Sequence, residues 1–163
     1  MRRLSLFAGL ALAVSILLPG SALAAVGGSN LPVIGSHAGD CTQNIATLQG
    51  HCVTTGRISH LGVTTMEQDF QSTGLGTGST VSGTWTLTVA NGDQMFGTVT
   101  GTSSTTDGVH FLMLGAWASS GGTGRLAKAS LTMDATVQLT IVSVEGAIAT
   151  FAGEVTLVGR LSH

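Results

Sequence analysis

The sequence predicts an all-β fold, a sandwich or a barrel, in one small domain that follows a cleaved signal peptide. Three observations predict this fold class. Apolar and polar residues alternate in several segments, glycine-rich breaks separate these segments, and no stretch after the signal peptide keeps a helical periodicity. Short strands joined by glycine-rich turns are typical of sandwiches and barrels. The chain that remains after cleavage is long enough to enclose one hydrophobic core.

The first element is a secretory signal peptide at residues 1–24. Two arginines precede an apolar run from Leu4 to Leu18, and Ala22-Leu23-Ala24 carries the small residues that signal peptidase needs. The apolar run is shorter than the roughly 20 residues that cross a bilayer. We therefore expect cleavage after Ala24, with Ala25 as the close alternative, and a secreted or periplasmic protein that has no membrane contact after cleavage.

The charge of the mature chain also excludes some partners. Two of the six Lys and Arg residues belong to the signal peptide, so the mature chain is more negative than the formal net charge of −2 of the whole sequence. A chain of this kind repels polyanions. We expect no nucleic-acid partner and no attachment to anionic membranes.

Residues 25–52 form a lead-in segment before the β-domain, and its glycines and Pro32 interrupt it too often for a long regular element. Cys41 and Cys52 are the only cysteines, and an exported protein meets an oxidising compartment. The sequence therefore predicts a disulfide between them that pins this segment. A metal site at Cys41, His51 and Cys52 is the alternative, but no second cysteine pair completes a tetrahedral site, so we expect no metal.

The β-domain is expected to span residues 53–163. Its clearest alternation runs from Val81 to Val89, where apolar residues share one face and threonine and serine share the other. The same pattern recurs over residues 131–141 and 150–157. Asn91-Gly92-Asp93 predicts a hairpin, because Asn-Gly supplies the positive φ of a tight turn. Further glycine-rich breaks leave about seven strands in all.

The strand expected at residues 109–118 differs from the others because both of its faces are apolar. One row is Val109, Phe111, Met113 and Trp117, and the other is Leu112, Leu114, Ala116 and Ala118. A single closed sheet buries only one face, and monomers rarely expose a large apolar patch. We interpret the second row as the contact of a homo-oligomer, a dimer or a trimer. The alternative is that the lead-in segment lies across it.

Three motifs resemble those of a known family: Ser59-His60-Leu61-Gly62, Ala90-Asn91-Gly92-Asp93 and Gly121-Gly122-Thr123-Gly124-Arg125. In order and spacing they resemble Thr-His-Leu-Gly, Ala-Asn-Gly-Asp and Gly-Gly-Thr-Gly-Arg-Phe of a family of small secreted bacterial proteins. The last motif is also similar to a segment of plant dirigent proteins. Dirigent proteins and allene oxide cyclases share an antiparallel eight-stranded barrel. The resemblance therefore implies such a barrel, and export, over residues 56–160.

The motif at residues 121–125 has a structural interpretation. A phosphate loop would continue into Gly-Lys-Ser or Gly-Lys-Thr and open a helix, and neither is indicated here. We expect Gly121, Gly122 and Gly124 to permit a sharp crossing at positive φ, with Arg125 reaching a carboxylate or a strand-end carbonyl. No cofactor is expected.

His60 is the candidate catalytic residue. Paired with Asp93 or Glu67 it would be a general base at the barrel mouth, although a structural histidine bonded to a backbone carbonyl is the interpretation we favour. Trp85, Met95 and Phe111 are the candidate ligand contacts inside the barrel.

We therefore expect an exported, non-enzymatic barrel that binds a small apolar molecule or associates with itself, since eight strands leave room for one small ligand. One alternative is a barrel isomerase or cyclase of the allene oxide cyclase or dirigent type, which shapes a reactive substrate. A surface-structural protein is another. An outer-membrane barrel is disfavoured because the chain has no tyrosine and few other aromatic residues for interfacial girdles. A lumen packed solid by Trp85, Met95, Phe111 and Phe151 would exclude a ligand.

Overall fold

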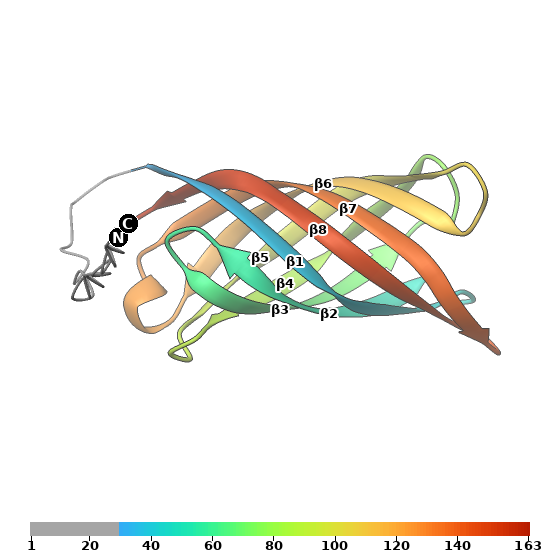
Figure 1. The fold of residues 1–163 in the computed structure, drawn as a ribbon, viewed down its shortest axis with the longest axis horizontal. Coiled ribbons are helices and arrows are strands. Elements are labelled where there is room, and N and C mark those ends of the chain that lie inside the picture. The colour runs from blue at the N-terminus through green and yellow to red at the C-terminus, as the bar shows by residue number, and fades with distance from the viewer. Residues whose placement is uncertain (1–29) are drawn as a thin grey trace, which may run out of the picture.

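Eight antiparallel strands close into a single barrel in the computed structural model, which describes residues 30–163 (Figure 1). Each strand pairs with the next along the chain, and the last pairs with the first. The strands are β1 (Leu31–Asn44), β2 (Gln49–Ile58), β3 (Gly62–Ser72), β4 (Ser79–Val89), β5 (Gln94–Thr105), β6 (His110–Gly122), β7 (Ser130–Glu145) and β8 (Ile148–Ser162). A short 3-10 helix, η1 (Gly124–Leu126), lies between β6 and β7. The predicted signal peptide lies outside the described residues.

The alternation seen in the sequence is the alternation between lumen and outer surface. In β4, Val81, Trp85 and Leu87 are buried in the lumen, whereas the serine and threonine residues between them face outward. Successive side chains of a strand point to opposite faces of the sheet, so a barrel needs one apolar face and one polar face. The predicted all-β barrel is confirmed.

The two ends of the barrel differ. The end that holds the start of β1 and the end of β8, at the left of Figure 1, is filled by large apolar side chains. Among them are Ile58, Leu87, Met95, Leu131 and Leu161, each at most 1% exposed. Leu126 of η1 is also buried there, which closes this end. We call it the closed end, and the opposite end the open end.

β1 is the main difference from the sequence prediction. The lead-in segment at 25–52 was expected to lack a long regular element, but residues 31–44 form a strand that pairs with both β2 and β8. Its glycines permit close approach of strands instead of breaking them. A Cβ at Gly39 would collide with the Val53 carbonyl oxygen and lie 2.8 Å from the Thr54 Cα. The barrel wall therefore begins at β1, and it has eight strands where the breaks in the sequence indicated about seven.

The outer face of β6 carries an apolar row. Leu112 is 41% exposed and Leu114 is 55% exposed, and Ala116 and Ala118 follow them on the same face. β1 does not cover this row, because it lies in the wall between β2 and β8. The alternative in which residues 31–44 lie across the row is thereby removed.

Candidate functional site

A cavity occupies the lumen at the open end of the barrel. It leaves about 70 Å³ for the centres of water-sized molecules, and it opens to solvent at its mouth. Its walls come from the ends of β1, β3 and β5, from the starts of β2, β4, β6 and β8, from the middle of β7 and from the loop between β3 and β4. Space of this kind holds a few water molecules or one small molecule of similar size. The lumen is therefore packed at one end and hollow at the other.

One wall of this cavity is apolar. β6, β7 and β8 contribute Phe111, Met113, Trp117, Val137, Leu139, Phe151 and Val155. The rings of Phe111 and Phe151 meet edge to face, with centroids 5.8 Å apart. This geometry is a favourable one for two aromatic rings.

The opposite side of the lumen is polar. Every buried Ser, Thr, His or Gln side chain of residues 30–163 lies on β1, β2 or β3. They are His37, Gln43, Thr54, Thr64, Gln68 and Ser72. Buried polar groups cost free energy unless they find partners. The partners of these six side chains therefore show which of them have a structural role.

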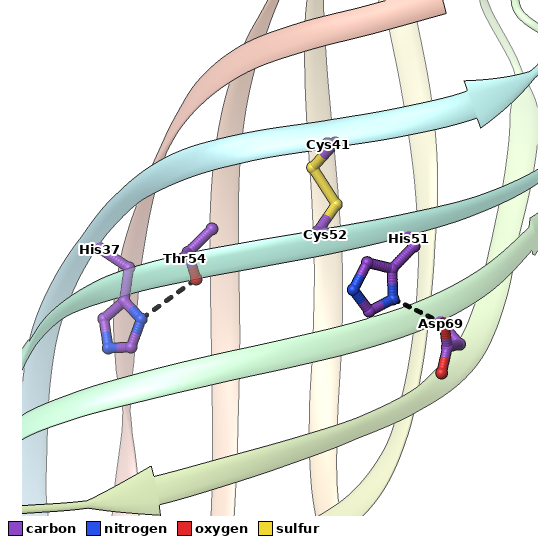
Figure 2. Close-up of a disulfide and its surroundings, with 6 residues drawn as sticks. All are labelled: His37, Cys41, His51, Cys52, Thr54 and Asp69. Carbon is purple, nitrogen blue, oxygen red and sulfur yellow. Dashed lines mark hydrogen bonds and ion pairs between the residues drawn. A yellow bond between two sulfur atoms is a disulfide. The ribbon is translucent and has the colours of Figure 1, made fainter. Parts of the chain in front are cut away.

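His37 is held by two threonines deep in the lumen. Its Nδ1 lies 3.2 Å from Thr54 Oγ1, and its Nε2 lies 2.8 Å from Thr64 Oγ1 (Figure 2 shows the first contact). Burial lowers the pKa of His37 below the usual histidine value, because desolvation disfavours the charged ring. The neutral ring bridges β1 to β3 across β2, so its role is structural.

Gln43 and Ser72 form a second satisfied pair near the open end. Gln43 Nε2 donates to Ser72 Oγ at 2.7 Å and to the Leu48 carbonyl oxygen at 3.2 Å. The Ser72 hydroxyl in turn donates to the Gly74 carbonyl oxygen at 3.0 Å. These bonds tie β1 to the end of β3 and to the loop that follows it.

Gln68 and Trp117 lack such partners. Gln68 lines the cavity and is only 7% exposed, yet no hydrogen bond joins its side-chain amide to another of the residues 30–163. Trp117 also lines the cavity, and its buried indole Nε1 has no acceptor in the described part of the chain. Trp85, in the packed part of the lumen, shows the contrast, because its Nε1 donates to the Thr98 carbonyl oxygen at 2.9 Å.

The predicted disulfide between Cys41 and Cys52 is present and forms part of the cavity wall. The two cysteines are directly opposed in the register of β1 and β2, and their side chains point into the lumen (Figure 2). A disulfide-bonded barrel suits an oxidising compartment. His51, the third member of the alternative metal site, faces outward and bonds Asp69, with His51 Nδ1 and Asp69 Oδ1 2.7 Å apart. No group of three metal-ligating side chains occurs in the described residues.

His60 is not part of the cavity wall; it lies in the turn between β2 and β3 at the closed end. It is exposed and adopts a φ of 68°. It borders a shallow outer hollow together with Arg57 and Thr156. Asp93, one proposed partner, bonds Asn91 and Arg125 instead, and Glu67 is exposed on β3. The structure therefore places His60 at a surface turn.

The three candidate ligand contacts separate into two groups. Phe111 lines the cavity, as does Phe151. Trp85 and Met95 are at most 1% exposed and belong to the packed part of the lumen. These four aromatic and methionine side chains therefore do not fill the barrel from end to end.

The family-like motifs form the turns at the closed end. Gly92 adopts a φ of 86° in the β4–β5 hairpin, as Asn-Gly predicts, and Gly62 follows the β2–β3 turn at a φ of 81°. Asp93 accepts hydrogen bonds from the Arg125 backbone N–H at 3.1 Å and from Arg125 Nε at 3.3 Å. The hydrogen bonds from Asn91 and Arg125 lower the pKa of Asp93. Arg125 thus reaches a carboxylate, as expected.

The glycines of the third motif need a correction. Gly124 alone has the predicted positive φ, at 53°, whereas Gly121 and Gly122 end β6 in ordinary backbone. Gly122 is required for a different reason, because a Cβ there would lie 2.5 Å from the Leu126 carbonyl oxygen and 2.9 Å from that of Gln94. It lets η1 pack close to the start of β5.

Sequence reasoning missed Gln68 and His37. The alternation carried a signal for both. His37 lies an even number of positions from Cys41 in β1, and Gln68 lies two positions from Met66 in β3, so each shares a face with that neighbour. Once a disulfide or an apolar neighbour identifies the inward face of a strand, the polar residues on that same face are also lumen residues.

No helix within residues 30–163 is long and apolar enough to cross a membrane. Comparisons with protein-family models, with curated proteins and with solved structures found no match to this chain.

Proposed function

We propose that this barrel is a non-enzymatic binding protein that holds one small, neutral, mostly apolar molecule in the cavity at its open end. The observation that carries the proposal is the cavity itself. Large apolar side chains fill one end of the lumen, whereas the other end leaves a cavity of about 70 Å³ for water-sized molecules, lined by seven large apolar side chains of β6, β7 and β8. Burying that apolar surface against a ligand would release free energy in proportion to its area.

The absence of charge in the wall indicates a neutral ligand. Among the described residues that line the cavity there is no Asp, Glu, Lys, Arg or His. A charged ligand would lose its hydration and find no ionic partner, at a large cost in free energy. Reaction chemistry by acid and base groups likewise has no side chain to use there.

A pair of fluorophores tests this proposal. N-phenylnaphthylamine is neutral, and anilinonaphthalene sulfonate is the same ring system with a charged group. We expect the first to gain fluorescence on binding to the protein with disulfide intact, and the second to bind at least tenfold more weakly.

Two variants locate the binding. Leu139→Trp fills the cavity from β7 and is expected to abolish the fluorescence gain. Val53→Trp places the same side chain on the outer face of β2, where Val53 is exposed, and is expected to leave the gain unchanged. Equal binding by both variants, with circular dichroism showing folded barrels, would contradict a lumen site.

Self-association is a second candidate function, favoured by the apolar row on β6. In the barrel register Leu114 lies between Thr102 of β5 and Thr136 of β7, so the row stands as an apolar ridge within a polar surface. A second copy of the chain that presents the same row would bury both ridges by two-fold symmetry. Dimer or trimer formation is therefore proposed alongside ligand binding.

Export completes the proposal. The signal peptide pattern at residues 1–24 and the resemblance to small secreted bacterial proteins both support a secreted or periplasmic location. The disulfide between Cys41 and Cys52 supports the same location, because such bonds persist in oxidising compartments.

A further inference from the structure

The buried polar side chains of the lumen divide into a satisfied group and one exception. His37 bonds Thr54 and Thr64, and Gln43 bonds Ser72. Five of the six buried polar side chains on β1, β2 and β3 are thus partners of one another, and Gln68 is the sixth. Its amide joins none of these bonds although it lies on the same wall.

The position of Gln68 is set by its strand neighbours. In register it lies between Cys52 of β2 and Trp85 of β4, facing the lumen. The disulfide packs on one side of it, and Trp85 is fixed by its bond to the Thr98 carbonyl. Gln68 is therefore a primary amide held in the cavity wall, with its donors and acceptor open to whatever occupies the cavity.

A second side chain without a partner, Trp117, differs from Gln68 because its N–H is fully enclosed. β6, three strands further around the barrel, contributes Trp117, whose Nε1 has no acceptor among residues 30–163. Tryptophan N–H groups usually find a partner when they are buried. The indole N–H is enclosed by protein, whereas the Gln68 amide faces a cavity whose other polar side chains, Gln43, Thr54, Ser72 and Ser103, all make hydrogen bonds.

We propose that Gln68 is the polar anchor of the lumen site and that its ligand is a neutral, mostly apolar molecule with a carbonyl or hydroxyl oxygen. Gln68 Nε2 donates to that oxygen. A hydrocarbon would leave the Gln68 amide without a partner. This inference rests on the proposed lumen binding and adds the class of ligand and the residue that selects it.

Two probes of matched shape distinguish a hydrogen bond to Gln68 from simple occupation of the apolar cavity. Acetophenone and ethylbenzene have nearly the same shape, and only acetophenone carries a carbonyl oxygen. Each is titrated against bound N-phenylnaphthylamine in the unmodified protein, in Gln68→Leu and in Gln138→Leu. Gln138 is exposed on the outer face of β7, so it receives the same substitution away from the cavity.

We expect Gln68→Leu to weaken displacement by acetophenone about tenfold, the equivalent of one buried hydrogen bond, and to leave ethylbenzene unchanged. Gln138→Leu should match the unmodified protein with both probes. In the unmodified protein, the side-chain amide resonances of Gln68 should shift with acetophenone and not with ethylbenzene. This NMR measurement keeps the test decisive even if Gln68→Leu fails to fold.

Two results would overturn the proposal, and they differ. If both probes displace the fluorophore and neither Gln68→Leu nor the amide resonances distinguish them, the cavity binds apolar molecules and Gln68 is no anchor, its amide being satisfied by water. If neither probe nor the fluorophore binds the folded protein, the proposed lumen binding itself fails, and the anchor with it.

Discussion

His37 Nε2 and Thr64 Oγ1 lie 2.8 Å apart inside the barrel, and this contact joins β1 to β3 across the strand between them. The histidine is 2% exposed and is neutral in the folded protein, because burial lowers its pKa. Its neighbours on the lumen wall are hydroxyl and glycine residues, such as Thr54 and Gly56, and none of these compensates a charge.

This contact predicts acid-sensitive stability. The unfolded chain binds a proton on His37 near its usual pKa of about 6.5, whereas the folded chain does so only at lower pH. The stability is therefore complete above about pH 6.5 and declines as the pH falls below it. We expect His37→Gln to flatten that decline between pH 7 and pH 5, measured as urea midpoints. His60→Gln, at an exposed turn, should keep the slope of the unmodified protein. Equal slopes in all three proteins would contradict the assignment.

The disulfide predicts a redox-dependent stability. Cys41 and Cys52 are separated by 11 positions in the chain, and closing a loop of that length stabilises a protein by about 3 kcal/mol in the chain-entropy model. We expect Cys41→Ala with Cys52→Ala to lose about that free energy of unfolding, measured by urea denaturation. Reductant should lower the midpoint of the unmodified protein and leave that of the double variant unchanged. A midpoint indifferent to reductant would show that the bond is not formed in the folded protein.

The lack of space around Gly122 predicts that a larger side chain there destabilises the barrel. Any side chain there meets the carbonyl oxygens of Leu126 and Gln94, so Gly122→Val must separate η1 from β5. We expect a loss of more than 2 kcal/mol, beyond the ordinary effect of surface changes, or aggregation. Gly76→Ala is the control, because a Cβ at Gly76 has no atom within 4 Å. Thermal unfolding of the two variants should differ by several degrees, and identical melting temperatures would exclude the close approach.

The apolar row on β6 predicts that the protein is an oligomer and that a charge placed in the row makes it monomeric. Sedimentation equilibrium of the disulfide-intact protein should report a dimer or a trimer, and Leu114→Glu should report a monomer with unchanged β-sheet circular dichroism. A charged group in the centre of an apolar contact is desolvated without a partner, so association is lost. Thr84→Glu, on the outer face of β4, should associate like the unmodified protein. A monomeric unmodified protein would refute self-association through this row.

The sequence alone determined the all-β class, most of the strands after residue 53 and the polarity of each face. Alternation from Val81 to Val89 predicted β4, Asn91-Gly92 predicted the β4–β5 turn, and two cysteines behind a predicted signal peptide predicted the bond between them. Each of these signals is local, or needs only the count of a rare residue. They also identified Phe111 as an inward residue, now found in the cavity wall.

Only the tertiary structure decided which residues meet across strands. A period of two assigns a side chain to a face, but the partner strand and its register depend on contacts far apart in the chain. The punctuated segment around Gly39 therefore became β1 only because β2 and β8 both pair with it. For the same reason, the pairing of His37 with Thr64 and the isolation of Gln68 appear only once the barrel has closed.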